Sequence, residues 1–193
     1  MRKIIAMTNT TLDGFIDNPH LWSMQYVNEE VQAYVMNLTL GSDTLLLGRV
    51  TYVGMAQAWP GRSNPYADHV NGLTKYVVSS TLEKAEWENS TIVHGDDLVA
   101  TVTELKKRPG GDIMIWGCGQ LTDTLMEHGL LDEYRLLVSP VILGQGQRLF
   151  RGENVTATLE LVDNTTFGSG LIALAYRPVN ATGAPVGDQP NAG

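Results

Sequence analysis

The stretch DIMIWGCGQL, residues 112–121, shows most clearly how this chain is built. Its first half has four apolar, β-forming residues after Asp112, which predicts a strand. The Gly117-Cys118-Gly119 turn ends that strand, and Leu121, Leu125 and Met126 then recur at helical spacing. A buried strand followed by a tight turn and an amphipathic helix is the building unit of an α/β domain.

Units of the same kind precede this stretch along the chain. The pattern predicts strands at Lys3–Met7, Thr44–Leu47, Lys75–Val78 and Thr91–Val93, and helices at about Asn28–Leu38, Arg49–Ala58 and Asp97–Lys107. The polar residues after Met7 are expected to form a loop. Three β-rich segments complete the chain, at Glu133–Val138, about Leu159–Thr166 and Leu171–Tyr176. The last two leave room only for a hairpin across residues 168–170, so we predict a mostly parallel sheet with an antiparallel end.

The composition is that of one folded domain. The chain has 193 residues, of which 43% are hydrophobic and 18% are charged. Folding a chain of this size would bury roughly 70% of its surface. We therefore assign residues 1–177 to a single domain. Residues 178–193 are mainly Pro, Gly, Asn and Ala with little to bury, and they are predicted to be a flexible tail.

The charge and the cysteine count exclude several classes of function. Thirteen basic residues against 21 acidic ones give a net charge of −8, which would repel a nucleic-acid backbone. The single cysteine allows no intrachain disulfide, and the four histidines lack metal-binding spacing, so no metal site is predicted. No apolar run is long enough to cross a bilayer and no signal peptide opens the chain, so we expect a cytoplasmic protein with no membrane partner.

Glycines and polar residues follow three of the predicted strands, as Gly48-Arg49, Ser79-Ser80 and the turn from Gly117 to Gln120. Open α/β sheets bind ligands at the carboxyl ends of their strands, so these segments could surround one phosphorylated ligand. Free N–H groups at helix starts and the Arg49 guanidinium would bind its phosphates. Each segment also has an ordinary interpretation as a turn, a surface ion pair or a helix cap. The full dinucleotide-binding fingerprint is absent, because Thr122 stands where its last glycine would be.

Five stretches, taken in order, make the chain similar to a known family. They are TLDGF at 11–15, LGRVTY at 47–52, KYVVSSTL at 75–82, IWGCGQL at 115–121 and PVILGQG at 140–146. On these residues the chain resembles the dihydrofolate reductase-like superfamily, and more closely the C-terminal reductase domain of the bacterial riboflavin-synthesis deaminase/reductase. The resemblance implies a three-layer α/β sandwich, a homodimer, and hydride transfer from NADPH to a small nitrogen-heterocycle substrate.

The resemblance also implies positions for the cofactor. Gly48, Arg49, Val50 and Thr51 match the segment that holds the pyrophosphate and the adenosine phosphate, and Ser79 and Ser80 match the adenosine-side contacts. The second pyrophosphate loop corresponds to Gly117, Cys118, Gly119, Gln120 and Leu121. In dihydrofolate reductases the first two residues of that loop are joined by a cis peptide, so the Gly117–Cys118 bond is expected to be cis. Gln120 departs from the arginine often found there, which leaves more of the 2′-phosphate recognition to Arg49.

On the substrate side the resemblance points to Asp13, on the loop beside the nicotinamide, as the catalytic carboxyl acid. A turn carboxylate is the alternative for this residue. Trp22 is a candidate for stacking on a planar substrate ring. The acid that dihydrofolate reductases carry on their first helix falls here near Gln32. Glu29 and Glu30 lie within one turn of it, and whether either takes that role is left open.

The resemblance favours a reductase that acts on 5-amino-6-(5-phosphoribosylamino)uracil. Other functions are kept as alternatives. The same fold could carry a pteridine or dihydrofolate-type reductase, or a nucleotide- or flavin-binding protein without catalysis. Cys118 lies just before a predicted helix, where a thiol pKa can be lowered. A cysteine hydrolase is therefore a further, more distant alternative.

Overall fold

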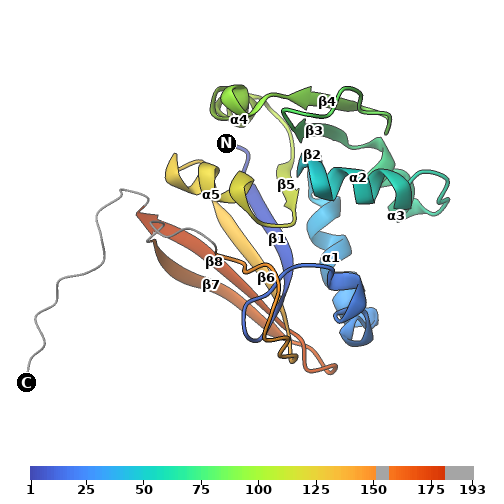
Figure 1. The fold of residues 1–193 in the computed structure, drawn as a ribbon, viewed down its shortest axis with the longest axis vertical. Coiled ribbons are helices and arrows are strands. Elements are labelled where there is room, and N and C mark those ends of the chain that lie inside the picture. Colours follow the sequence, from blue (N-terminus) through green and yellow to red (C-terminus); the bar gives the residue numbers. More distant parts are fainter. Residues whose placement is uncertain (151–156, 181–193) are drawn as a thin grey trace, which may run out of the picture.

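One mixed sheet forms the centre of the molecule. The computed structural model describes residues 1–150 and 157–180, and in these residues eight strands lie in the order β4-β3-β2-β5-β1-β6-β8-β7. The strands are β1 (Ile4–Thr11), β2 (Ser42–Gly48), β3 (Thr74–Val78), β4 (Ser90–Val93), β5 (Asp112–Trp116), β6 (Glu133–Ser139), β7 (Thr158–Thr166) and β8 (Ile172–Asn180). The strands from β4 to β6 pair in parallel, whereas β8 is antiparallel to both β6 and β7. The predicted mostly parallel sheet with an antiparallel end is confirmed (Figure 1).

Helices connect the parallel strands and cover both faces of the sheet. They are α1 (Glu29–Leu40), α2 (Arg49–Ala58), α3 (Pro65–Gly72), α4 (Leu98–Lys107) and α5 (Gln120–Glu127). Three short 3-10 helices are η1 (Pro19–Leu21), η2 (Met24–Tyr26) and η3 (Gly95–Asp97). No helix in the described ranges is long and apolar enough to span a membrane.

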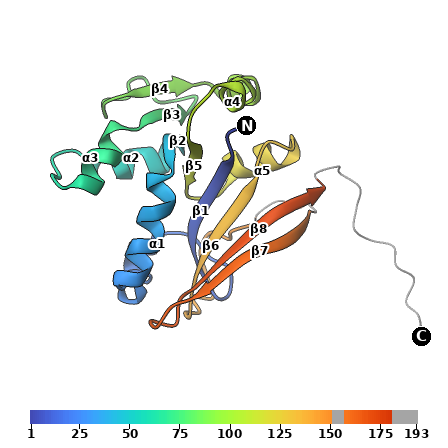
Figure 2. The ribbon, with the colours of Figure 1, turned by 180° about the vertical axis from the view of Figure 1, so that it is seen from behind.

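Side-chain alternation along the strands divides the core into two layers. Met7, Leu45 and Met114 face α1, α2 and α3, and we call this the α1 face of the sheet. Ala6, Leu46 and neighbouring residues on the opposite face pack against α4 and α5. Figure 2 shows α1 running beside β1. The three-layer sandwich is therefore present.

Local signals explain where the helices begin. The Asn28 side chain accepts a hydrogen bond from the Val31 N–H at 3.0 Å, which caps α1 as predicted. The sequence reasoning missed α3, although its start carries an ordinary signal. Asn64 caps it through the Ala67 N–H at 2.9 Å, and Pro65 occupies its first turn.

The structure corrects two predicted boundaries. β1 does not end at Met7 but continues through four polar residues to Thr11, because its backbone pairs with β6 as far as the Thr11–Ser139 pair. β8 continues past its predicted end at Tyr176 and pairs with β7 as far as Asn180. The rest of the predicted tail, residues 181–193, lies outside the described residues.

Candidate functional site

Three of the segments singled out in the sequence meet at one edge of the sheet. Gly48, Ser79 and Gly117 lie at or directly after the carboxyl ends of β2, β3 and β5, which are adjacent in the order β3-β2-β5. Gly48 pairs with Val78, the last residue of β3. A Cβ on Gly117 would lie 3.0 Å from Thr51 Oγ1, so the first turn of α2 touches the loop after β5. The predicted convergence of these strand ends is present.

The start of α2 has the properties of an anion-binding helix end. Gly48 precedes the helix and supplies no side-chain cap, so the first N–H groups of α2 have no side-chain acceptor from the N-cap. Arg49 is exposed and makes no ion pair with any described residue. Val50 is 77% exposed beside it. A phosphate at this position would meet free donors, the positive end of the helix dipole and a guanidinium.

The loop after β5 turns on two glycines with positive φ. Gly117 has φ +83° and Gly119 has φ +156°, which are conformations that side chains with a Cβ rarely adopt. The predicted cis bond between Gly117 and Cys118 is wrong, since every described peptide bond is trans. The two glycines make the sharp turn without it.

The hydrogen bonds of this loop limit which of its groups can meet a ligand. The Gly117 N–H donates to the Met7 carbonyl at 2.8 Å, and the Gly119 N–H donates to Thr122 Oγ1 at 3.0 Å. The backbone donors of α5 nearest this loop are then those of its first turn, which begins with Gln120 and Leu121. Gln120 is exposed and Leu121 is half-buried.

Ser79 and Ser80 differ in whether they are exposed to a ligand. The Ser79 hydroxyl is buried and accepts hydrogen bonds from the Thr81 N–H at 3.1 Å and the Leu82 N–H at 2.9 Å. It therefore organises the turn after β3, which was the ordinary interpretation of this residue. Ser80 is exposed next to it.

Cys118 is half-buried, and its thiol lies in a desolvated environment. Burial raises the pKa of the Cys118 thiol to about 12, so the thiolate is scarce at neutral pH. The structure thereby corrects the cysteine-hydrolase alternative, because the helix start does not lower this pKa.

We expect native Cys118 to react with iodoacetamide at pH 8 about a thousandfold more slowly than an unperturbed thiol, since the thiolate fraction falls in that proportion. Intact-mass measurements over time would give the rate. The same protein in denaturant is the control and should be alkylated quickly. Rapid alkylation of the folded protein would contradict the buried-thiol assignment.

Asp13 braces two loops at the carboxyl ends of β1 and β6. Thr11 Oγ1 donates to its carboxylate at 2.6 Å, and the N–H groups of Leu143 and Gly144 donate at 3.2 and 2.8 Å. These hydrogen bonds, the one from Thr11 first, lower the pKa of Asp13. A proton donor at neutral pH needs a raised pKa. The contacts therefore do not support the predicted acid role of Asp13 and correspond to the turn-carboxylate alternative.

We expect Asp13→Asn to loosen the 141–147 loop and to leave cofactor affinity within a few-fold. The amide cannot accept hydrogen bonds on both of its terminal atoms, so Leu143 or Gly144 loses its partner. Their amide hydrogens should exchange about tenfold faster or more, whereas those of β2 should not change. A collapse of turnover with unchanged exchange at these two amides would restore the acid role.

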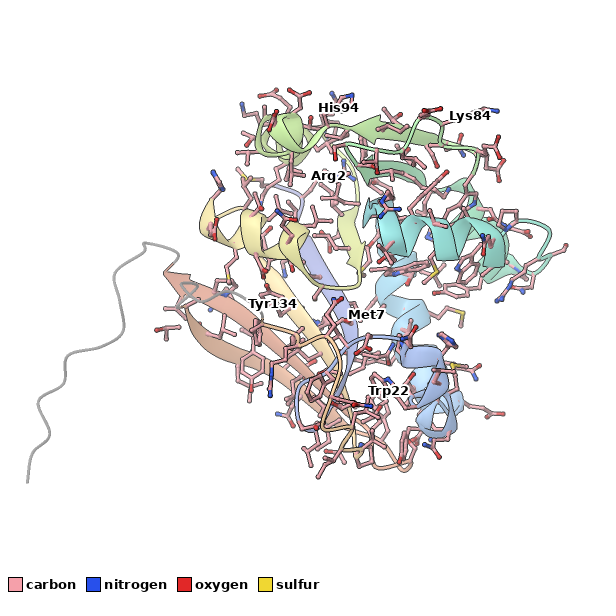
Figure 3. The ribbon with its side chains drawn as sticks, viewed as in Figure 1. Arg2, Met7, Trp22, Lys84, His94 and Tyr134 are labelled. Carbon is pink, nitrogen blue, oxygen red and sulfur yellow. The ribbon has the colours of Figure 1, made fainter. Side chains whose placement is uncertain are left out.

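Trp22 and Gln32, which were predicted to contact substrate, have different surroundings. Trp22 is 7% exposed, and its indole Nε1 donates to the Asp17 carbonyl at 2.9 Å, so it packs in the η1–η2 segment. Figure 3 places it among the loops at the lower end of that view, apart from Met7 in the middle of the molecule. Gln32 is exposed on α1. The substrate roles predicted for Trp22 and Gln32 are therefore not supported.

The α1 helix presents no carboxylate to the sheet. Glu29 and Glu30 are both exposed, and Glu30 Oε2 accepts from the Gly168 N–H at 3.2 Å, which ties α1 to the β7–β8 turn. Val31, at 1% exposed, takes the inward position. An apolar side chain, and neither of the two glutamates, therefore occupies the inward position of this helix turn.

The sequence reasoning missed an aromatic and cationic group next to Gly117. The rings of Trp59 and Trp116 lie 5.6 Å apart at 34°, and the Arg62 guanidinium lies 5.2 Å over Trp59. Arg62 makes no ion pair with any described residue. Such a group can hold a planar ring or an anion. No local signal joins Trp59 to Trp116, since only the packing of α2 brings them together.

Other parts of the molecule offer less chemistry. A surface pocket of about 350 Å³ lies at the opposite, amino-terminal edge of β2, and it is lined by Ser42, Asp43, Asp68, His69, Gly72 and Leu73. Within residues 1–150 and 157–180, no three His, Cys, Asp or Glu side chains gather as a metal site requires.

Sequence comparison finds relatives over almost the whole chain. A family model described as the RibD C-terminal domain matches residues 2–173. The protein YyaP of Bacillus subtilis (strain 168) is 34% identical over 187 residues, and the match covers 91% of this chain and 94% of YyaP.

Two solved structures show the same fold. A protein from Shewanella sp. PV-4 assigned to riboflavin biosynthesis has a TM-score of 0.74 at 21% identity, over 92% of this chain and 99% of the other. A dihydrofolate reductase from Enterococcus faecalis complexed with NADP(H) has a TM-score of 0.55 at 15% identity, over 92% and 97%. The fold is therefore of the dihydrofolate reductase-like type.

Proposed function

Since this chain belongs to the RibD C-terminal domain family, which comprises reductases of the riboflavin-pathway type, we propose that it uses NADPH to reduce a nitrogen-heterocycle substrate. The proposed substrate resembles 5-amino-6-(5-phosphoribosylamino)uracil. The observation that carries the proposal is the contact between the start of α2 and the Gly117 loop, at the carboxyl ends of adjacent strands. Ligands of open α/β sheets bind at such an edge.

In the proposed complex, the chain holds the cofactor mainly through α2. The free N–H groups of its first turn and the Arg49 guanidinium would bind phosphate, and Val50 and Thr51 would border it. Gly117 and Gly119 would let the β5–α5 loop approach the pyrophosphate closely, with Cys118 as packing and Gln120 and Leu121 as donors. Ser80 would face the adenosine, and Ser79 would shape the turn that carries it.

The α1 helix favours a riboflavin-type substrate over a pteridine. A pteridine reductase of the dihydrofolate type anchors its substrate on a carboxylate of this helix, and here Val31 occupies the inward position. Arg62, over Trp59 and near Trp116, is a cation that a substrate phosphate could meet. We propose that Asp13 positions the loops beside this site and does not itself donate a proton.

Steady-state NADPH oxidation by the purified chain tests the proposal, followed as loss of the reduced nicotinamide absorbance. We expect turnover with 5-amino-6-(5-phosphoribosylamino)uracil and none with dihydrofolate. Faster turnover with dihydrofolate would identify a pteridine reductase instead. Tight NADPH binding without turnover of either compound would identify a binding protein without catalysis.

A further inference from the structure

Three polar side chains point from neighbouring strands to the α1 face of the sheet. Trp116 ends β5, Asn9 lies on β1 and Ser139 ends β6, and these strands are adjacent in the order β5-β1-β6. Met7, Leu137 and Trp116 belong to the core on the α1 face. Because side chains alternate along a strand, Asn9 and Ser139 point to the same face as Met7 and Leu137.

The strand register places Asn9 between the other two residues. Met7 pairs with Trp116, and Thr11 pairs with Ser139. Asn9 is therefore diagonal to both Trp116 and Ser139 on the same face. Neighbouring strands lie about 4.8 Å apart and two residues span about 6.6 Å, so each diagonal is about 8 Å at the backbone. The three residues form a row that we call the polar row.

The polar row has no hydrogen-bond partners within the protein as described. Ser139 is 0% exposed and Trp116 is 7% exposed, and neither Ser139 Oγ nor Trp116 Nε1 has a partner among the described residues. Asn9 is half-buried, and its side-chain amide likewise makes no hydrogen bond to the described part of the chain. Leaving buried polar groups unpaired costs free energy. Two such buried groups and the half-buried Asn9 amide, all beside the candidate cofactor edge, indicate a ligand with complementary polar groups.

We propose that the polar row recognises the amide edge of the heterocyclic substrate, an inference that rests on the proposed function. The Asn9 amide both donates and accepts, so it pairs with a ring N–H next to a C=O. Trp116 Nε1 only donates and thus needs a C=O, whereas the Ser139 hydroxyl can do either. The substrate class is therefore a cyclic ureide or lactam. An apolar or N-alkylated ring would leave the row unpaired.

Calorimetric titration with two related probes tests this assignment, using 5,6-diaminouracil and its 1,3-dimethyl derivative, with and without NADPH. Methylation removes both ring N–H donors. The wild-type protein should bind 5,6-diaminouracil at least about tenfold more tightly than the dimethyl compound. Asn9→Leu should weaken binding of 5,6-diaminouracil by about 10- to 100-fold and leave the dimethyl compound unaffected.

A pair of serine variants separates recognition from folding. Ser139→Ala should weaken 5,6-diaminouracil binding by about five- to tenfold without lowering the melting temperature of the ligand-free protein, since the hydroxyl has no partner to lose. Ser90→Ala is the matched control, because Ser90 Oγ on β4 is also buried and unpartnered. It should leave binding unchanged.

The outcomes distinguish this inference from the proposed function. Equal affinity for the two probes, or wild-type binding by Asn9→Leu and Ser139→Ala, would overturn the polar row. Loss of the proposed function would appear instead as absent NADPH binding, measured separately by nicotinamide fluorescence. If both variants turned over the uracil substrate with an unchanged KM, the proposed function would hold, and only the role of the polar row in substrate recognition would be wrong.

Discussion

Gly117→Val is expected to lose NADPH binding by more than a hundredfold. Gly117 has φ +83°, and a β-branched side chain at such an angle is strained by about 1–3 kcal/mol. Its Cβ would also lie 3.0 Å from Thr51 Oγ1. The added methyl groups would push the start of α2 away from the β5–α5 loop, so that the two segments proposed to hold the pyrophosphate separate. Fluorescence titration with NADPH measures the effect.

Two control variants separate this contact from general damage. Gly129, at the end of α5, has φ +62° and nothing within 4 Å of an added Cβ. Gly129→Val should thus cost stability but keep NADPH affinity. Cys118→Ala should keep both binding and turnover, since the thiol has no chemical role. If Gly129→Val lost NADPH binding as fully as Gly117→Val, the contact with Thr51 would not be the cause. An inactive Cys118→Ala protein that still bound NADPH would favour thiol chemistry.

Arg49→Ala is expected to weaken NADPH binding by about 1.5–3 kcal/mol, or roughly 10- to 150-fold, through loss of a charge-assisted contact. Arg49 is exposed and has no ion-pair partner among the described residues, so no internal contact competes for it. NADH lacks the 2′-phosphate, and its affinity should change much less. The loss for NADPH should also shrink at high salt, because the contact is electrostatic.

Arg108→Ala is the matched control for this substitution. Arg108 is also an exposed arginine, but it follows α4 on another part of the surface. Its removal changes the net charge equally and should leave NADPH affinity within about twofold, as for surface charges away from a site. Equal losses in the two variants would mean that net charge, and not a contact from Arg49, sets the affinity.

Much of the fold follows from local patterns. The buried runs at β2 and β5 and the turn after β7 were predictable because apolar strands and glycine turns carry strong short-range signals. The end of β1 was not predictable, since Thr8 to Thr11 have the composition of a loop. Their backbone nevertheless pairs with β6 as far as the Thr11–Ser139 pair, and pairing of this kind outweighs composition.

The candidate site likewise contains some residues that could be predicted from the sequence and others that could not. Gly48-Arg49 and the Gly117 turn were predictable, because a glycine between a buried strand and a helix has a short-range physical meaning. The surroundings of Asp13, Trp22 and Gln32 were not predictable in this way. Asp13 contacts Leu143 and Gly144, which are distant in the chain, and no local pattern shows which loop a carboxylate will brace.

Most of the strands and helices, the parallel character of the sheet and the glycine turns at its carboxyl edge could be predicted from the sequence, because these depend on spacing within a few residues. The position of β1 between β5 and β6 could be learned only from the folded molecule. That order aligns Asn9 with Trp116 and Ser139, and the packing of α2 sets Trp59 against Trp116. Strand order and register depend on contacts between distant segments, so they emerge only when the whole core is packed.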